Sequence, residues 1–158
     1  MRSRFSWLAV FVTFLMAAIL EVMVLPELVQ HYRPQWLALI LIYWLLRYPE
    51  QIGMSCAVIF GLIMDVISGA TLGVHVLTYA ITCYLILSMH QRLKMFPIIQ
   101  QSIVMFILVA TQLMMVSLLS RMLVGTTNDL SYLWLALTSA LVWPIILILT
   151  DRLSLALR

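Results

Sequence analysis

Hydrophobic residues dominate this chain in six runs, and polar residues are confined to the short joints between them. A helix needs about 20 apolar residues, with a range of ~17–25, to cross the hydrocarbon core of a bilayer. The first and the last three runs meet that length, the third lies at its lower edge, and the second is short. We therefore predict an all-α integral membrane protein, a six-helix bundle forming a single transmembrane domain over residues 1–158, with spans at residues 5–25, 34–48, 52–68, 72–89, 98–119 and 132–150.

The second run is the weakest span. Its apolar part extends from Trp36 to Leu46, and Arg47 and Pro49 close it. At 1.5 Å per residue the whole run makes a helix only ~22 Å long. Such a helix crosses the membrane by thinning the bilayer locally or by lying beside longer neighbours. A five-span arrangement, in which this segment enters and leaves on the same side, is the alternative.

The distribution of charge predicts an orientation. Charged residues make up only 9% of the chain, against ~25% in soluble domains. Lys and Arg are concentrated in alternate joints, and such a bias in short loops sets the orientation of a membrane protein. Both termini are predicted to be cytoplasmic, which leaves only Arg33 and Arg121 outside and places seven basic residues inside: Arg2, Arg4, Arg47, Arg92, Lys94, Arg152 and Arg158. The net charge of +3 is thus a topology signal, without the clustering that nucleic-acid binding requires.

Asp65 is the most costly residue to place in a membrane, because a carboxylate at the centre of a span costs ~2.5–3.5 kcal/mol. Gly53, Ala57 and Gly61 precede it at intervals of four. This spacing keeps small residues near one helix face, on which another backbone can approach closely. Asp65 is therefore predicted to point into a helix contact. Its role is either functional, as a proton, ion or partner site, or structural, accepting hydrogen bonds from the following turn or pairing with an arginine.

Two further charged residues lie at the same predicted level of the membrane. Glu21 is near the outer end of the first run, and Arg33 begins the second. We expect a buried or half-buried ionic cluster of Glu21, Arg33 and Asp65, in which Arg33 pairs with one of the carboxylates. Such a cluster mainly fixes which helices touch and in what register. A transport role is the less favoured alternative.

The inventory of reactive side chains argues against an enzyme. No histidine has a metal-ligating partner three or four residues away on the same helix, and the sequence has no glycine-rich phosphate loop. Cys56 and Cys83 fall inside predicted spans, where cysteine is typically a small apolar filler. We predict no catalytic residue, no bound cofactor and no metal.

Four short motifs stand out from the apolar background: Arg33-Pro34-x-Trp36, Tyr43-Trp44, Gly61-x-x-x-Asp65-x-x-Ser68-Gly69-x-x-Leu72-Gly73, and Trp143-Pro144. Together with the length and the six runs, they resemble the rod shape-determining protein MreD family across the whole chain. The third motif is the most specific. With the small-residue stripe it defines the candidate packing or partner residues, namely Gly53, Ala57, Gly61, Asp65, Ser68, Gly69 and Gly73.

The resemblance implies a non-catalytic, multi-pass protein of the bacterial inner membrane that takes part in cell elongation. It implies direct binding to MreC, a single-span protein with a periplasmic domain. It also implies membership of one complex with MreB filaments, RodA and a penicillin-binding transpeptidase, which build side-wall peptidoglycan. The fold implied is that of the substrate-binding subunits of energy-coupling-factor transporters.

A second function class uses the same outer helix ends differently. A small-molecule-binding subunit of an importer needs an outward pocket lined by polar and aromatic groups from several helices. The outer ends offer such groups: Glu21, Arg33, Trp36, Asp65 and His75. Copurification discriminates between the two classes, because MreC supports the first and an energy-coupling ATPase module supports the second.

Overall fold

The computed structural model describes residues 7–23, 32–125 and 132–156, and most of these residues are helical. The helices are α1 (Trp7–Val22), α3 (Trp36–Arg47), α4 (Met54–Ser68), α5 (Val74–Met95), α6 (Ile98–Val124) and α7 (Tyr132–Ala156). No strand occurs in the described residues, so the all-helical prediction is confirmed. Six membrane crossings stay a prediction, and three residues behind the predicted orientation, Arg2, Arg4 and Arg158, lie outside the described ranges.

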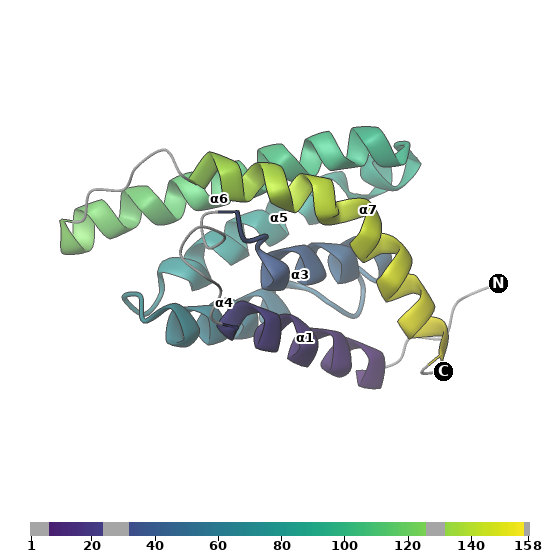
Figure 1. Ribbon diagram of the computed structural model, residues 1–158, viewed down its shortest axis with the longest axis horizontal. Coiled ribbons are helices and arrows are strands. Elements are labelled where there is room, and N and C mark those ends of the chain that lie inside the picture. The colour runs from purple at the N-terminus through teal and green to yellow at the C-terminus, as the bar shows by residue number, and fades with distance from the viewer. Residues whose placement is uncertain (1–6, 24–31, 126–131, 157–158) are drawn as a thin grey trace.

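The helices differ in their fitness to cross a bilayer. By length and composition, the segments Ile98–Leu123 of α6 and Leu133–Ala156 of α7 are long and apolar enough. The helices α1, α3 and α4 are apolar but shorter, with 16, 12 and 15 residues. Figure 1 shows α6 and α7 along one side of the bundle, α1 and α4 along the other, and α3 between them. The shorter helices are therefore held beside longer ones.

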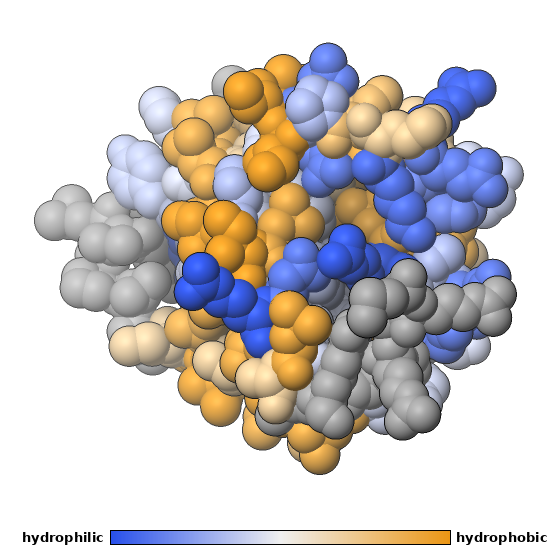
Figure 2. Space-filling model, turned by 90° about the vertical axis from the view of Figure 1, so that its right-hand side faces the viewer, coloured by the Kyte–Doolittle hydropathy of each residue, from blue (hydrophilic) through white to orange (hydrophobic). Residues whose placement is uncertain are grey.

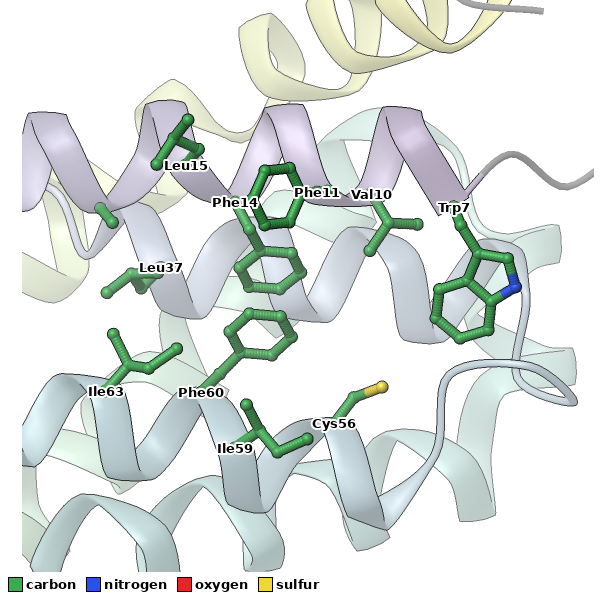
Figure 3. A pocket seen from close by; sticks show the side chains of 11 residues that line it. Trp7, Val10, Phe11, Phe14, Leu15, Leu37, Cys56, Ile59, Phe60 and Ile63 are labelled. Atoms are coloured by element: carbon green, nitrogen blue, oxygen red, sulfur yellow. The ribbon is translucent and has the colours of Figure 1, made fainter.

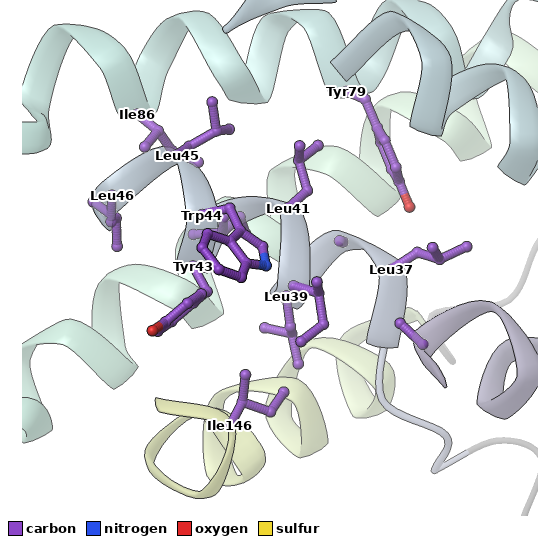
Figure 4. Packing of buried hydrophobic residues seen from close by; sticks show 14 of the residues in the cluster. Leu37, Leu39, Leu41, Tyr43, Trp44, Leu45, Leu46, Tyr79, Ile86 and Ile146 are labelled. Carbon is purple, nitrogen blue, oxygen red and sulfur yellow. The ribbon is translucent and has the colours of Figure 1, made fainter. Parts of the chain in front are cut away.

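The short helix α3 forms the centre of the bundle. Every residue from Leu37 to Leu46 is buried, and α3 packs against α1, α4, α5 and α7. Figure 4 shows its side chains pointing outward in several directions, toward Tyr79 and Ile86 of α5 and Ile146 of α7. A helix that is apolar all round is stable when protein or lipid covers every face. Here neighbouring helices provide that cover.

The last three helices are longer than the apolar runs that predicted them. α5 continues to Met95, α6 to Val124 and α7 to Ala156. Polar residues such as Arg, Lys and Gln are good helix formers, so a helix does not end where its apolar run ends. The chain stops α5 just before Pro97, which disfavours helical backbone in the residue preceding it. Gly125, at φ 72°, ends α6 in the left-handed conformation common after helices.

The last helix contains Pro144 in its interior. Proline removes one backbone hydrogen bond and clashes with the preceding turn, so it bends a helix. Figure 1 shows α7 changing direction along its length. The adjacent Trp143 is fully buried and donates a hydrogen bond from Nε1 to Oε1 of Gln101 on α6, at 3.4 Å. The indole ring thus anchors this part of α7 to α6.

The exterior of the bundle is mostly apolar, with large hydrophobic side chains exposed along α1, α4, α6 and α7. Figure 2 views the end of the bundle that carries the C-terminal part of α7, where hydrophilic residues gather above and beside hydrophobic ones. Arg47, at the end of α3, and Arg152 of α7 are both exposed. Exposed charged residues near helix ends, with apolar flanks between them, suit a protein surrounded by lipid.

Candidate functional site

The predicted small-residue face of α4 packs against α5 of the same chain. A Cβ atom built on Gly61 would lie 2.5 Å from the Cα of Val76 and 2.9 Å from the backbone oxygen of His75. Only glycine permits that approach. Ala57, one turn earlier, is also completely buried. Gly53 precedes α4, and a Cβ built there meets nothing within 4 Å, so it takes no part in this contact.

Asp65 lies one turn beyond Gly61 and faces the first turn of α5. It is 1% exposed, and its two carboxylate oxygens accept hydrogen bonds from the backbone N–H groups of Gly73, at 2.7 Å, and His75, at 2.8 Å. Its Oδ1 also lies 2.9 Å from Nδ1 of the His75 ring. The first N–H groups of a helix have no partner within the helix and favour negative charge. Asp65 therefore caps α5, which Gly73, having no side chain, cannot do.

Two glycines shape the turn between these helices. Gly69 has φ 62° and Gly73 has φ 101°, a region that favours glycine. After the turn at Gly69, the N–H of Ala70 donates to the backbone oxygen of Asp65 at 3.2 Å, which is typical of a helix ending in a left-handed residue. The Ser68 hydroxyl donates to a carbonyl one turn back at 2.7 Å. The motif from Gly61 to Gly73 thus builds one compact corner between α4 and α5.

A second carboxylate joins α1 to the start of α3 in a similar way. Glu21 is 7% exposed, and its Oε2 accepts a long hydrogen bond from the N–H of Leu37 at 3.5 Å. Its Oε1 lies 3.7 Å from Nη2 of Arg33. The same guanidinium nitrogen donates to the backbone oxygen of Leu20 at 3.1 Å. Both buried carboxylates, Glu21 and Asp65, therefore lie near the end of one helix. Each accepts hydrogen bonds from backbone N–H groups at the start of the next helix.

The three-residue ionic cluster expected from the sequence divides into two separate pairs, Glu21 with Arg33 and Asp65 with His75. The physical reason is local. The start of α5 follows Asp65 after a short turn and offers it two backbone donors and an imidazole, so the carboxylate needs no distant arginine. Of the structural roles considered for Asp65, this geometry matches the acceptor of hydrogen bonds from the following turn.

A further cluster, which sequence reasoning missed, lies at the other end of α3. Asp151 of α7 accepts a hydrogen bond from the Tyr43 hydroxyl at 2.5 Å and lies 3.1 Å from Nη2 of Arg47. At the opposite end of α3, the N–H of Gln35 donates to Oγ of Ser139 at 3.0 Å. α3 and α7 therefore run in the same direction, and a hydrogen bond to α7 is present at each end of α3. The signal that was available is the spacing of four between Tyr43 and Arg47, which places both on one helix face.

Two polar side chains of the described interior, one on α5 and one on α6, lie next to each other. The Tyr79 hydroxyl of α5 and the Gln112 amide of α6 are neighbours, and both residues are almost completely buried. Neither makes a hydrogen bond of good geometry with any described residue. Two surface hollows, one between α1 and α4 and one between α1, α3 and α7, are lined by other, mostly apolar residues. Of the groups that the outer helix ends offer to an importer subunit, Trp36 lines the second surface, whereas Glu21, Asp65 and His75 line neither.

These features define a class of protein: a small helical membrane protein whose buried ionisable groups join one helix to the next. Comparison with known proteins identifies the family. Residues 1–153 match the family model described as rod shape-determining protein MreD. The chain is 28% identical over 158 residues to the rod shape-determining protein MreD of Haemophilus influenzae, an alignment that covers 96% of this chain and 95% of that protein. No solved structure matches the chain.

The chain therefore belongs to the MreD family, a membrane protein family that acts in rod shape determination. The resemblance predicted from the short motifs is confirmed. The most specific of those motifs, from Gly61 to Gly73, coincides with the corner between α4 and α5 described above.

Proposed function

We propose that this protein is a non-catalytic, multi-pass subunit of the cell-elongation machinery in the bacterial inner membrane. It binds MreC and helps couple MreB filaments to side-wall peptidoglycan synthesis by RodA and its partner transpeptidase. The observation that carries the proposal is the match to the MreD family over residues 1–153. Membership of that family supports a role in rod shape, and the partners and their coupling are the proposed extension.

The geometry of the buried acids supports a non-catalytic role. Asp65 accepts two backbone hydrogen bonds and contacts His75, and Glu21 is shared between Arg33 and the start of α3. Each of these carboxylates thus has a structural partner within the protein. We therefore expect the purified protein alone to show no turnover of lipid-linked peptidoglycan precursors. Turnover by the isolated protein would overturn this part of the proposal.

The proposed topology has six crossings with both termini in the cytoplasm. The basic bias between alternate joints supports it, as does the position of α3, which neighbouring helices surround so that it need not match the bilayer by itself. Reporter domains fused at Val29 and Thr127 should behave as periplasmic, and those fused at Met95 and Arg158 as cytoplasmic. A periplasmic C-terminus would contradict the six-span arrangement. We further propose the fold of energy-coupling-factor substrate-binding subunits, which superposition of an experimental structure tests.

Copurification with complementation tests the functional proposal directly. In a bacterium lacking its own copy of the gene, cells should lose rod shape and regain it when the full chain is expressed. Affinity purification of the tagged chain from its native membrane should recover MreC. Recovery of an energy-coupling ATPase module without MreC would instead support the importer subunit and refute the proposal.

A further inference from the structure

Three buried polar atoms, one on α5 and two on α6, have no hydrogen bond of good geometry with any described residue. They are the Tyr79 hydroxyl and both polar atoms of the Gln112 amide. Tyr79 is 1% exposed and Gln112 is 2% exposed. Nearly all buried polar groups in folded proteins are paired with protein or with ordered water. This neighbouring pair of side chains therefore needs a further partner.

A direct bond between the two side chains would not complete them. A phenol has one donor and can also accept, whereas a primary amide has an acceptor oxygen and a nitrogen with two donors. If the Tyr79 hydroxyl donates to Oε1 of Gln112, the amide N–H groups stay unpaired. If the hydroxyl accepts from Nε2, the amide oxygen and the phenolic proton stay unpaired. The missing partner must both donate and accept, and water does so in the smallest volume.

The depth of the pair in the membrane makes an unpaired group costly. Tyr79 follows the start of the predicted span 72–89 by seven residues, and Gln112 precedes the end of the predicted span 98–119 by seven. Both therefore lie ~10 Å inside the same edge of the hydrocarbon layer. Because that layer contains no bulk water, polar groups at this depth are satisfied by protein or by water held within the protein.

A third polar group faces the same region of the interior. Figure 4 shows Tyr79 projecting from α5 with its hydroxyl oxygen toward the Leu37 end of α3. At that end the Glu21 carboxylate accepts a hydrogen bond from the Leu37 N–H at 3.5 Å and lies 3.7 Å from Arg33, and it acts electrostatically on Tyr79. Both of these contacts are long, so the carboxylate has capacity for another donor. An internal water typically has ~2–4 polar partners, and Tyr79, Gln112 and Glu21 supply that number.

We propose that an ordered water molecule binds between the Tyr79 hydroxyl and the Gln112 amide and joins α5 to α6 inside the membrane. It forms a second polar link between these helices. The first lies where α5 ends, and there Nε2 of Gln101 on α6 donates to the backbone oxygens of Leu93 at 3.0 Å and Phe96 at 3.2 Å. The hollow between α1 and α4 offers no comparable site, because mainly apolar side chains surround it (Figure 3) and apolar cavities stay dry.

Hydroxyl-radical footprinting tests the site against an equally buried reference. The full chain in lipid nanodiscs is exposed to a short synchrotron X-ray pulse, which splits water into hydroxyl radicals, so a buried ring is oxidised when a water molecule lies beside it. Mass spectrometry then compares Tyr79 with Trp44, which is also 1% exposed and whose Nε1–H donates to the Thr13 hydroxyl at 2.9 Å. Both ring types react readily with the radical. We expect several-fold more oxidation at Tyr79, and equal protection of the two rings would overturn the proposal.

Two variants of α6 locate the water. Gln112→Leu removes the amide and should lower the oxidation of Tyr79 to the level of Trp44. Release of the water and burial of an apolar side chain offset the hydrogen bond that Tyr79 loses, so this variant is expected to fold. Thr111→Val is the matched control, because Thr111 is exposed and its hydroxyl bonds within its own helix, and it should leave the oxidation unchanged.

The remaining outcomes also decide the proposal. Oxidation of Tyr79 that persists in folded Gln112→Leu would place the water elsewhere and refute the site. If Gln112→Leu does not fold, as judged by gel filtration and circular dichroism, a high-resolution experimental structure of the parent chain replaces it. Density for a water within hydrogen-bond distance of both Tyr79 and Gln112 is then expected, and a structure without that density would refute the proposal.

Discussion

Replacing Gly61 with alanine is the sharpest test of the corner between α4 and α5. The added methyl carbon would lie 2.5 Å from the Cα of Val76, 2.8 Å from its nitrogen and 2.9 Å from the oxygen of His75. All three atoms belong to the backbone of α5, so a side-chain rotation cannot relieve the contact. The two helices must move apart.

The size of the effect follows from these distances. Ordinary contact begins at 3.4 Å, so the methyl group must move ~0.9 Å from the Val76 Cα, and overpacking of this kind costs about 1–3 kcal/mol. The same movement stretches the bonds from Asp65 to Gly73 and His75, now 2.7 and 2.8 Å, beyond good geometry. Alanine recovers up to ~1 kcal/mol through its higher helix propensity. We therefore expect a net destabilisation of about 1–3 kcal/mol, made up of these opposing contributions.

The free energy of unfolding is measured by reversible titration of the purified protein with sodium dodecyl sulfate, followed by tryptophan fluorescence. Gly53→Ala is the matched control, because Gly53 has φ −124° and a Cβ built there meets nothing within 4 Å. The control should stay within ~0.5 kcal/mol of the parent protein. Rod-shape complementation at normal expression should weaken for Gly61→Ala and be lost for Gly61→Leu. Equal stability of Gly61→Ala and Gly53→Ala would refute the close approach of α4 to α5.

Three further predictions concern the polar contacts. Asp65→Asn keeps one hydrogen-bond acceptor and should lower stability moderately. Asp65→Leu leaves two buried N–H groups without an acceptor, at a cost of about 1–3 kcal/mol each. Equal effects of the two variants in the same titration would contradict the capping role. Tyr43→Phe removes a hydrogen bond to the Asp151 carboxylate, worth ~1–2 kcal/mol. This variant should lose more stability than Arg47→Met, because the ion pair of Arg47 with Asp151 is largely exposed. The reverse order of melting temperatures would refute this ranking. Gln112→Leu removes a buried amide that lies beside the Tyr79 hydroxyl without a hydrogen bond of good geometry, and it should be neutral or stabilising. A large loss of thermal stability would show that Gln112 and Tyr79 stabilise each other.

The helical architecture was predictable because its signals are local. Long apolar runs and the breaks at Gly69 and Pro97 depend on neighbouring residues only, and the structure forms its helices between those breaks. Which helices pack against one another was not predictable, because leucine, isoleucine and valine side chains pack equally well against many apolar surfaces. For this reason the sequence indicated that residues 34–48 form a short, apolar segment that could lie beside longer neighbours, but it did not indicate that helices surround the segment on several sides.

The polar contacts divide in the same way. The spacing of Gly61 and Asp65 predicted a close helix contact that contains the carboxylate, and the structure has both on α4 against α5. The partner of Asp65 depends on how the turn folds, so the sequence left hydrogen bonds from the turn and an arginine as open alternatives. The bond between Tyr43 and Asp151 joins residues 108 positions apart. Residue spacing within one helix gives no information about contacts between residues so far apart in the sequence. The cluster of Tyr43, Arg47 and Asp151 was therefore missed.

The central position of α3 has a consequence for the biogenesis of the protein. With 12 residues, α3 is ~18 Å long, far short of the ~30 Å of hydrocarbon that a segment must span when it leaves the translocon alone. The helices that surround α3 include α7, which is synthesised after all the other described helices, and Asp151 of α7 accepts a hydrogen bond from Tyr43 of α3. The second hydrophobic segment therefore reaches its final position only after the ribosome has synthesised α7. A nascent chain that ends before α7 would leave this segment without one wall of its site and expose it to membrane quality-control proteases.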